Sequence, residues 1–159
     1  MQTLYLLMGI QGAGKTTYAK KMVDSNTVHI SRDEIRFKLI EPNEEYFAKE
    51  AQVFKTFMNE INNNLKEGKN VVADATHLNE KSRSKFFHYL KCDKNKLNII
   101  IIFIDTPLEK CLEQNELRKD SRAYVPRNVI KKAYNELTTP TREEQNKYNL
   151  NSMITVWKD

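Results

Sequence analysis

Short apolar runs alternate with amphipathic stretches along most of the chain. These runs predict five strands, over residues 3–8, 28–30, 70–73, 97–104 and 152–157. The run LNIIIIFI at 97–104 is nearly all apolar, as expected for a strand that is covered on both faces. Between the runs, apolar residues recur at helical spacing. This pattern predicts helices over residues 15–23, 31–40, 43–67, 79–90 and 107–119 and from residue 126 onward.

Two of these helices carry recognisable start signals. Ser31 and Glu34 have the S-x-x-E spacing of a capping box, which predicts a helix running toward Ile40. The longest helical pattern follows Asn43, a residue suited to cap a helix, and stops before Gly68. Its apolar positions alternate by four and three: Phe47, Ala51, Phe54, Met58, Ile61 and Leu65.

Alternating strands and helices favour an α/β fold with a mostly parallel sheet and helices on both faces. In such sheets ligands bind at the carboxyl ends of the strands. Three predicted strands end at notable groups, which are a glycine cluster at 9–14, Asp74 and Asp105. No repeat, low-complexity tract or Pro/Gly-rich linker divides the 159 residues, so we expect a single domain over 1–159.

Composition narrows the class of protein without identifying its partner. The chain is 40% hydrophobic and 30% charged, and its formal net charge of +5 suits a polyanion but is weak support by itself. No apolar run approaches the roughly 20 residues of a membrane span, and residues 1–3 lack the features of a signal peptide. Cys92 and Cys111 share no metal-binding spacing. We therefore expect a cytoplasmic protein with two reduced thiols and no membrane partner.

Three of the four glycines lie in GIQGAGKT, residues 9–16, which matches the phosphate-loop pattern G-x-x-x-x-G-K-[ST]. Glycines let backbone N–H groups converge on phosphate oxygens, and the following helix directs its N-terminus at the same anion. The Lys15 ammonium suits the β- and γ-phosphates, and the Thr16 hydroxyl suits Mg²⁺. The expected nucleotide-binding residues of this loop are Gly12, Ala13, Gly14, Lys15, Thr16 and Thr17.

The rest of the chain favours a small kinase over other phosphate-loop proteins. The GTPase patterns D-x-x-G and N-K-x-D are absent, and the chain is short for the large mechanical ATPases. A kinase needs a group that orients the acceptor hydroxyl and cations that stabilise the transferred phosphoryl group. Asp33 and Arg36 lie three apart on one predicted helix, so Asp33 can accept a proton while Arg36 holds an acceptor phosphate. A helix-end aspartate beside a solvated arginine is the alternative.

Two further segments carry candidate groups. Asp74 ends an apolar strand, where a Walker B carboxylate would hold Mg²⁺, and Thr76 follows it as a candidate acceptor contact. A turn-capping aspartate is the alternative at this position. The polar segment 118–126 lies between two predicted helices and is suited to form a lid, with Arg118 and Arg122 reaching the phosphates. Exposed charge at a helix end is the alternative there.

Four blocks occur along the chain in the order G-x-x-x-x-G-K-T, SRDEIR, VVADATHLNEKSR and QNELRKDSRAYVP. On these blocks the chain resembles the phosphate-loop kinase group that contains the bacteriophage 5′-hydroxyl polynucleotide kinase. The resemblance spans residues 9–126 and implies a P-loop NTPase fold with five strands in the order 2-3-1-4-5 and a small lid at about 118–126. By position it implies these roles: Lys15 and Thr16 as phosphate and Mg²⁺ ligands, Asp33 as general base, Arg36 as acceptor-phosphate contact, Asp74 as the Walker-B-like aspartate, and Arg118 as the catalytic lid arginine with Arg122 as second candidate.

The resemblance also implies the reaction, which is transfer of the γ-phosphate of ATP, with Mg²⁺, to the 5′-OH of DNA or RNA. The same group contains zeta-toxin-like kinases of nucleotide sugars and kinases of small metabolites, and these are the alternative. A nucleotide-dependent nucleic-acid binder without catalysis is a third possibility. No D-x-D phosphatase signature occurs, so we expect no 3′-phosphatase activity from this chain. Basic side chains suited to extend the contact with a polynucleotide are Arg32, Lys38, Lys81 and Arg83, with a solvated surface as the alternative for most of them.

Overall fold

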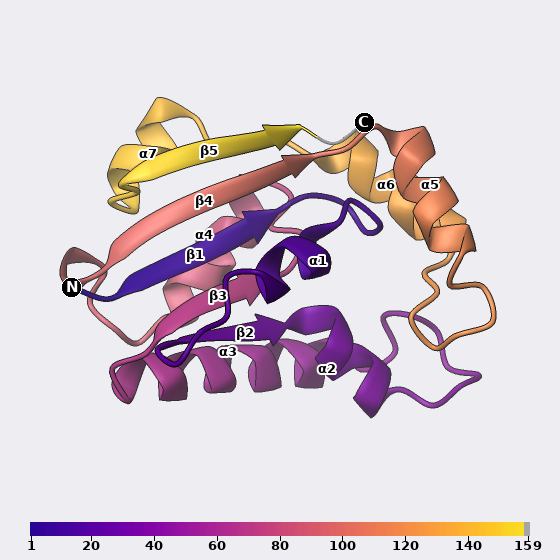
Figure 1. Cartoon of the computed structure of the whole chain (residues 1–159), viewed down its shortest axis with the longest axis horizontal. Coiled ribbons are helices and arrows are strands. Elements are labelled where there is room, and N and C mark those ends of the chain that lie inside the picture. Colours follow the sequence, from indigo (N-terminus) through magenta and orange to yellow (C-terminus); the bar gives the residue numbers. More distant parts are fainter. Residues whose placement is uncertain (158–159) are drawn as a thin grey trace.

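The computed structural model describes residues 1–157 and contains a five-stranded sheet in the order β2-β3-β1-β4-β5 (Figure 1). Every neighbouring pair of strands is parallel, so all carboxyl ends lie along one edge of the sheet. The predicted α/β fold and strand order are therefore confirmed. The strands are β1 (Thr3–Met8), β2 (Thr27–Ser31), β3 (Asn70–Asp74), β4 (Asn98–Asp105) and β5 (Ser152–Trp157).

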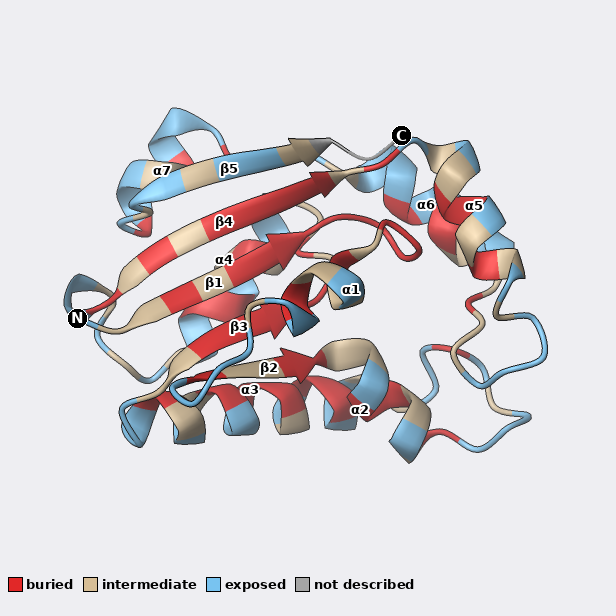
Figure 2. Cartoon of the chain, in the orientation of Figure 1, coloured by how far each residue is buried: buried red, intermediate tan, exposed pale blue. Residues whose placement is uncertain are grey.

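Helices cover both faces of the sheet, as predicted. One apolar core lies under α3 (Glu50–Lys66), α4 (Glu80–Tyr89) and the end of α7 (Arg142–Lys147). A second core lies under α1 (Lys15–Lys20), α5 (Leu108–Glu116) and α6 (Arg127–Glu136). α2 (Arg32–Leu39) follows β2, and a short 3₁₀ turn (Lys94–Lys96) precedes β4. Figure 2 shows the buried residues gathered in the central strands and on the inward faces of the helices.

The nearly uniform apolarity of β4 is explained by these two cores. Successive side chains of a strand point to opposite faces, so Ile99 and Ile101 enter the first core while Ile102 and Ile104 enter the second. A polar residue at either set of positions would be placed in an apolar layer without a hydrogen-bond partner, which is costly.

The prediction that the longest helix begins at Asn43 is wrong. Helix α3 begins at Glu50 with Lys49 at its N-cap, and residues 41–49 form turns. Tertiary hydrogen bonds decide this segment: Tyr46 turns inward and is 7% exposed, and the Lys49 ammonium donates to the carbonyl oxygen of Leu39 at 2.7 Å. Phe47 is consequently displaced from the buried helical face and is 54% exposed. The residues that α3 buries are Val53, Phe54, Phe57, Met58, Ile61 and Leu65.

The suggestion that Arg83 extends a nucleic-acid surface is also wrong. Arg83 is fully buried and forms an ion pair with Glu144 of α7, in which Nε lies 2.5 Å and Nη2 lies 3.0 Å from the two carboxylate oxygens. Its Nη1 donates to the carbonyl oxygens of His77 and Thr138 at 2.8 and 2.9 Å. Arg83 thus ties α4 to α7 and to the loop after β3. Helix α7 has no strong apolar period in the sequence and was not among the predicted helices.

His77, for which the sequence predicts no role, is a buried structural residue. Its ring packs edge-on against Phe86, and Nδ1 lies 2.6 Å from the carbonyl oxygen of Leu7. The backbone at His77 is left-handed, with φ of 45°. Burial lowers the pKa of His77 to about 4, below its ordinary value of 6.5, so the folded protein holds this ring neutral.

This low pKa predicts an acid-sensitive contribution to stability. The unfolded chain binds the His77 proton more tightly, so the contribution is complete above about pH 6.5 and decreases as the pH falls toward 4. Wild type should lose about 2 kcal/mol more unfolding free energy between pH 7 and pH 5 than the variant His77→Asn. Asparagine tolerates the left-handed backbone and does not titrate. Urea unfolding of both proteins at the two pH values measures the difference, and equal losses would contradict the prediction.

Residues 117–125 connect α5 to α6 and overlap the segment at about 118–126 that the sequence predicts as a lid; we call this segment the lid, and its closure over the cleft stays a prediction. The buried side chain of Asn115 holds the far end of this loop, because its Nδ2 donates to the Val125 carbonyl at 2.7 Å and its Oδ1 accepts from the Val125 N–H at 2.9 Å.

In the part of the chain that the structure describes, no helix is long and apolar enough to cross a bilayer.

Candidate active site

A cleft of about 720 Å³ lies at the carboxyl edge of the sheet. Its walls come from the loop after β1, the start of α2, the end of β3, the segment 45–50, the lid and α6. The cleft brings together most of the residues that the sequence singles out. The predicted site residues that line it are Gly12, Gly14, Lys15, Thr16, Asp33, Arg36, Asp74, Thr76 and Arg118.

The loop after β1 has the backbone that its glycines permit. Gly12 and Gly14 have φ of 85° and 101°, in the left-handed region that side chains disfavour. A Cβ atom at Gly12 would also lie 2.4 Å from the Cys111 carbonyl oxygen, so only glycine allows the loop to rest against α5. The hydroxyl of Thr106, the residue after β4, donates to the Ala13 carbonyl at 2.7 Å and fixes the loop from that side. The loop is thus anchored on two sides.

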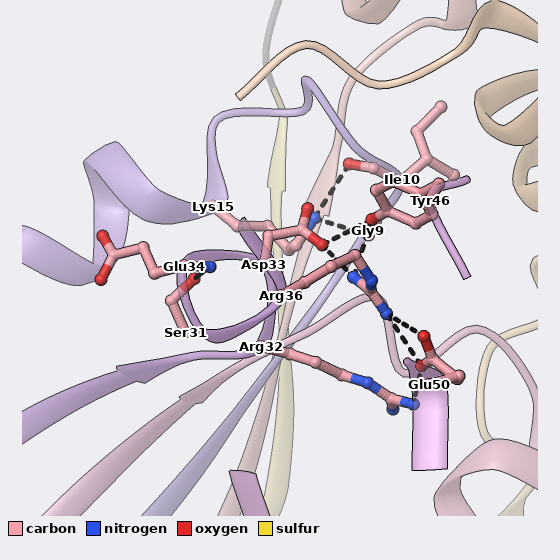
Figure 3. Close-up of polar contacts among 10 residues, drawn as sticks. All are labelled: Gly9, Ile10, Lys15, Ser31, Arg32, Asp33, Glu34, Arg36, Tyr46 and Glu50. Atoms are coloured by element: carbon pink, nitrogen blue, oxygen red, sulfur yellow. Dashed lines mark hydrogen bonds and ion pairs between the residues drawn. The ribbon is translucent and has the colours of Figure 1, made fainter. Parts of the chain in front are cut away.

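Lys15 lies inside this loop and is only 9% exposed. Its ammonium donates to the carbonyl oxygens of Gly9 and Ile10 at 2.8 and 3.0 Å (Figure 3). Burial lowers the pKa of Lys15, and the nearby carboxylates of Asp74 and Asp33 only partly oppose that shift. A buried cation held by two neutral carbonyls gains from an approaching anion, so the loop is electrostatically suited to phosphate.

Asp74 and Thr16 meet at the floor of the cleft. The Thr16 hydroxyl donates to Oδ2 of Asp74 at 2.9 Å, and His29 Nε2 lies 2.7 Å from the same oxygen. Burial by itself raises the pKa of Asp74, but the hydrogen bond from His29 and the charge of Lys15 hold it below its ordinary value. The carboxylate is therefore ionised at neutral pH. The sequence did not identify His29, whose one signal is a polar residue inside an apolar strand.

Asp33 and Arg36 lie on one face of α2, as their spacing predicts. Nη1 of Arg36 and the hydroxyl of Tyr46 both donate to Oδ1 of Asp33 (Figure 3), and Oδ2 accepts no hydrogen bond from residues 1–157. Burial and the Asp33 charge raise the pKa of Tyr46 well above 10, so its hydroxyl stays protonated as a donor. The side chain of Asp33 is 37% exposed, whereas that of Arg36 is 4% exposed. Asp33 thus has one fixed oxygen and one accessible oxygen.

Glu50, at the start of α3, completes this cluster. Both of its carboxylate oxygens accept from Nη2 of Arg36, at 2.8 and 2.6 Å, and Arg32 also binds Oε1. Two arginines and two carboxylates therefore balance in charge. Nε of Arg32 and Nε of Arg36 are buried and have no hydrogen-bond partner within residues 1–157. Buried guanidinium donors without acceptors are costly, so an oxygen atom from water or from a ligand is favoured at these positions.

Other predicted residues lie apart from the cleft. Arg122 binds the carbonyl oxygen of Ile40 and lines a second cavity of about 440 Å³ between the lid and the segment 40–46. Ala13 is buried in the loop, and Thr17 is exposed on α1. Their roles in binding nucleotide stay predictions. Lys38 and Lys81, suggested as outlying basic contacts, are not among the residues that line the cleft.

A protein-family model described as an AAA domain matches residues 4–140. The chain belongs to this family. The matched region contains the phosphate loop, Asp33, Asp74 and the lid, so the chain is a nucleotide-binding phosphate-loop domain of the kinase type, as predicted.

Individual relatives agree with this assignment. The chain is 31% identical over 145 residues to a putative bifunctional polynucleotide kinase/RNA ligase of Autographa californica nuclear polyhedrosis virus, and the match covers 82% of this chain but only 20% of that protein. This relative and the family match support phosphotransferase activity.

Solved structures share the fold. A chain of the Pnkp1/Rnl/Hen1 RNA repair complex superposes with a TM-score of 0.67 at 23% identity, over 92% of this chain and 46% of the other. A gluconokinase from Sinorhizobium meliloti 1021 superposes with a TM-score of 0.60 at 15% identity, over 98% and 82%. At these identities the superpositions establish the fold alone. The chain thus spans less than half the length of the polynucleotide kinase relative and of the RNA repair protein.

Proposed function

We propose that this domain transfers the γ-phosphoryl group of ATP, with Mg²⁺, to the 5′-hydroxyl of a DNA or RNA strand. The observation that carries the proposal is that Asp33 and Lys15 line one cleft, with Oδ2 of Asp33 accessible and its Oδ1 held by Arg36 and Tyr46. A phosphoryl transferase needs a proton acceptor opposite a phosphate-binding loop, and this cleft contains both.

The loop residues bind the donor. As the triphosphate enters, the Lys15 ammonium exchanges the carbonyls of Gly9 and Ile10 for β- and γ-phosphate oxygens. Arg118 lines the cleft from the lid and adds positive charge beside the transferred group. When the acceptor oxygen bonds to the γ-phosphorus, its proton moves to Oδ2 of Asp33. The bond between that phosphorus and the β–γ bridging oxygen breaks, and ADP leaves with the electron pair.

The donor set of Thr16 and Asp74 fits Mg²⁺. A hydroxyl and an ionised carboxylate 2.9 Å apart at the cleft floor are oxygen ligands of the kind this ion takes alongside water and substrate phosphates. No cluster of three or more His, Cys, Asp or Glu side chains occurs among residues 1–157, and Mg²⁺ does not require one. When bound, Mg²⁺ neutralises charge on the β- and γ-phosphate oxygens.

The acceptor is proposed to be a polynucleotide because Arg32 and Arg36 offer N–H donors suited to a phosphate on the Asp33 side of the cleft. Both guanidinium groups are bound by Glu50, and the phosphate that follows a terminal nucleoside would supply further oxygens to their donors. Relatives with polynucleotide kinase and RNA repair in their names agree with this substrate class. Gluconate carries a carboxylate and a nucleotide sugar carries a diphosphate, so charge alone does not separate these alternatives from a polynucleotide, and a direct comparison of acceptors decides between them.

The test is γ-phosphate transfer by the purified protein to 5′-OH oligonucleotides of increasing length, in DNA and RNA form and at several salt concentrations. Nucleosides, a nucleotide sugar and gluconate serve as competing acceptors. We expect an oligonucleotide with at least one internucleotide phosphate to be labelled more efficiently than a free nucleoside. Labelling of gluconate or a nucleotide sugar in preference to every oligonucleotide would establish the small-molecule alternative. Donor binding without transfer to any acceptor would favour a non-catalytic binder.

A further inference from the structure

Phe47 is an exposed aromatic residue in the wall of the catalytic cleft. It is 54% exposed, although a phenylalanine side chain is among the residues most often withdrawn from water. It lines the same cleft as Asp33 and Lys15. The proposed chemistry of phosphoryl transfer does not use it. Single exposed apolar residues are common on protein surfaces, but this ring lies in the wall of a substrate cleft, where it offers a ligand an apolar face.

The ring lies one side chain away from the proposed proton acceptor. The Arg36 guanidinium lies over the Phe47 ring, 5.6 Å from its centroid, and the same guanidinium binds Asp33. Phe47 and Asp33 thus contact the same guanidinium from the wall of one cleft. In a nucleoside the base is joined through one sugar to the 5′-hydroxyl, so a base on the other face of Phe47 and a hydroxyl at Asp33 would belong to the same terminal nucleotide.

The orientation of the Phe47 ring is fixed by its neighbour Tyr46. Tyr46 meets Phe47 edge to face, with 4.8 Å between centroids and 86° between planes. Tyr46 is itself buried and bound to Asp33 and Arg36. A pre-oriented aromatic ring loses little conformational entropy when a ligand binds, so its stacking is effective.

We propose that Phe47 is a stacking platform for a nucleobase at the 5′ end of the acceptor. The inference rests on the proposed function and deepens it, because it assigns the acceptor to nucleic acids rather than to sugars or other acceptors without a planar face. Every base has a π-face, so a single phenylalanine ring accepts all of them and imposes no sequence requirement. The platform thus binds the unpaired end of a DNA or an RNA strand.

The test compares Phe47→Ala with Phe47→Trp in steady-state kinetics on a 5′-OH oligonucleotide. Base stacking on an aromatic side chain corresponds to about a 5- to 150-fold change in affinity, and the alanine variant should raise KM for the oligonucleotide within this range. Its kcat and its KM for ATP should stay within about threefold of wild type. The tryptophan variant should restore KM. Tyr89→Ala, which removes a 52% exposed aromatic residue of α4 away from the cleft, is the matched control and should change none of these values.

An acceptor whose terminal nucleotide is abasic separates stacking from general packing. On this acceptor, wild type and Phe47→Ala should have the same KM, because no base is present to stack. A 2-aminopurine base at the 5′ end should be quenched on binding to wild type and Phe47→Trp, and less by Phe47→Ala. If Phe47→Ala does not fold, wild type and Phe47→Trp decide the matter: each should have a higher KM for the abasic acceptor than for the intact one and should quench the 2-aminopurine, whereas equal KM values for the two acceptors would overturn the platform.

The outcomes distinguish this inference from the proposed function. If wild type labels no oligonucleotide, the proposed function fails and the platform fails with it. If wild type labels oligonucleotides and Phe47→Ala has an unchanged KM for them, only the platform is overturned. A fall in kcat without a change in KM would assign Phe47 to support of Asp33 through Tyr46, and would likewise overturn the platform.

Discussion

Replacing Asp33 with asparagine should lower kcat for phosphoryl transfer by about 10²- to 10⁴-fold while donor affinity changes little. This range is the usual contribution of a positioned general base. Asparagine has nearly the same shape and can still accept hydrogen bonds from Arg36 and Tyr46, but it cannot take the acceptor proton. Arg36 keeps Glu50 as a charge partner, so the variant leaves no buried cation without a carboxylate.

The measurement is single-turnover transfer to a 5′-OH oligonucleotide, with nucleotide affinity determined separately by calorimetry. Asp24→Asn is the matched control, because Asp24 is exposed next to β2 at the amino end of the sheet and does not line the cleft. It should keep wild-type turnover. Turnover of Asp33→Asn within about threefold of wild type would remove Asp33 from the role of base. A loss of nucleotide affinity that explains the whole fall in rate would do the same.

Replacing Glu144 with alanine should lower the free energy of unfolding by about 3–5 kcal/mol. The change leaves Arg83 fully buried and charged without its carboxylate partner. The remaining acceptors of Arg83 are the neutral carbonyls of His77 and Thr138, which cannot balance the charge. The effect should also loosen α7 from α4, because the ion pair is the main polar link between them.

Urea unfolding followed by circular dichroism measures this loss. Glu143→Ala is the matched control: Glu143 is the exposed neighbour of Glu144 in the first turn of α7, and its loss should cost less than about 1 kcal/mol through the helix dipole. Glu144→Gln keeps hydrogen-bond acceptance without the charge, so its stability should lie between those of alanine and wild type. Equal stability of the alanine variants at 143 and 144 would show that Arg83 does not depend on this carboxylate.

Local patterns were sufficient for the phosphate loop and for the sheet. The glycines of the loop indicate backbone angles that few other residues adopt, and Gly12 also allows the loop to approach α5 closely. The apolar runs report burial, since each side chain of β4 enters one of two cores. The helical spacing of Asp33 and Arg36 placed them on one face of α2. Strand ends placed Asp74 at the cleft, because parallel strands end at one edge.

The partners of these residues depended on contacts between distant segments. Tyr46 and Glu50 lie 13 and 14 residues from Asp33 and Arg36, and the helical period through Asn43 and Phe47 pointed to the wrong structure. A period of apolar residues measures only local burial. Such a period carries no information about the hydrogen bond from the Tyr46 hydroxyl to the Asp33 carboxylate on α2. In residues 43–49 tertiary hydrogen bonds of this kind prevailed over helical propensity.

The arginines of this protein also separate what the sequence determines from what the tertiary structure decides. The sequence determined that Arg36, Arg83, Arg118 and Arg122 are cations in segments near a predicted cleft, since charge belongs to the residue itself. Only the tertiary structure decided that Arg118 lines the cleft, that Arg122 binds Ile40, and that Arg83 is buried with Glu144. The reason is the range of the forces: backbone angles and burial periodicity are set by neighbours in the chain, whereas the partner of a long charged side chain is whichever opposite charge or carbonyl the fold brings within reach.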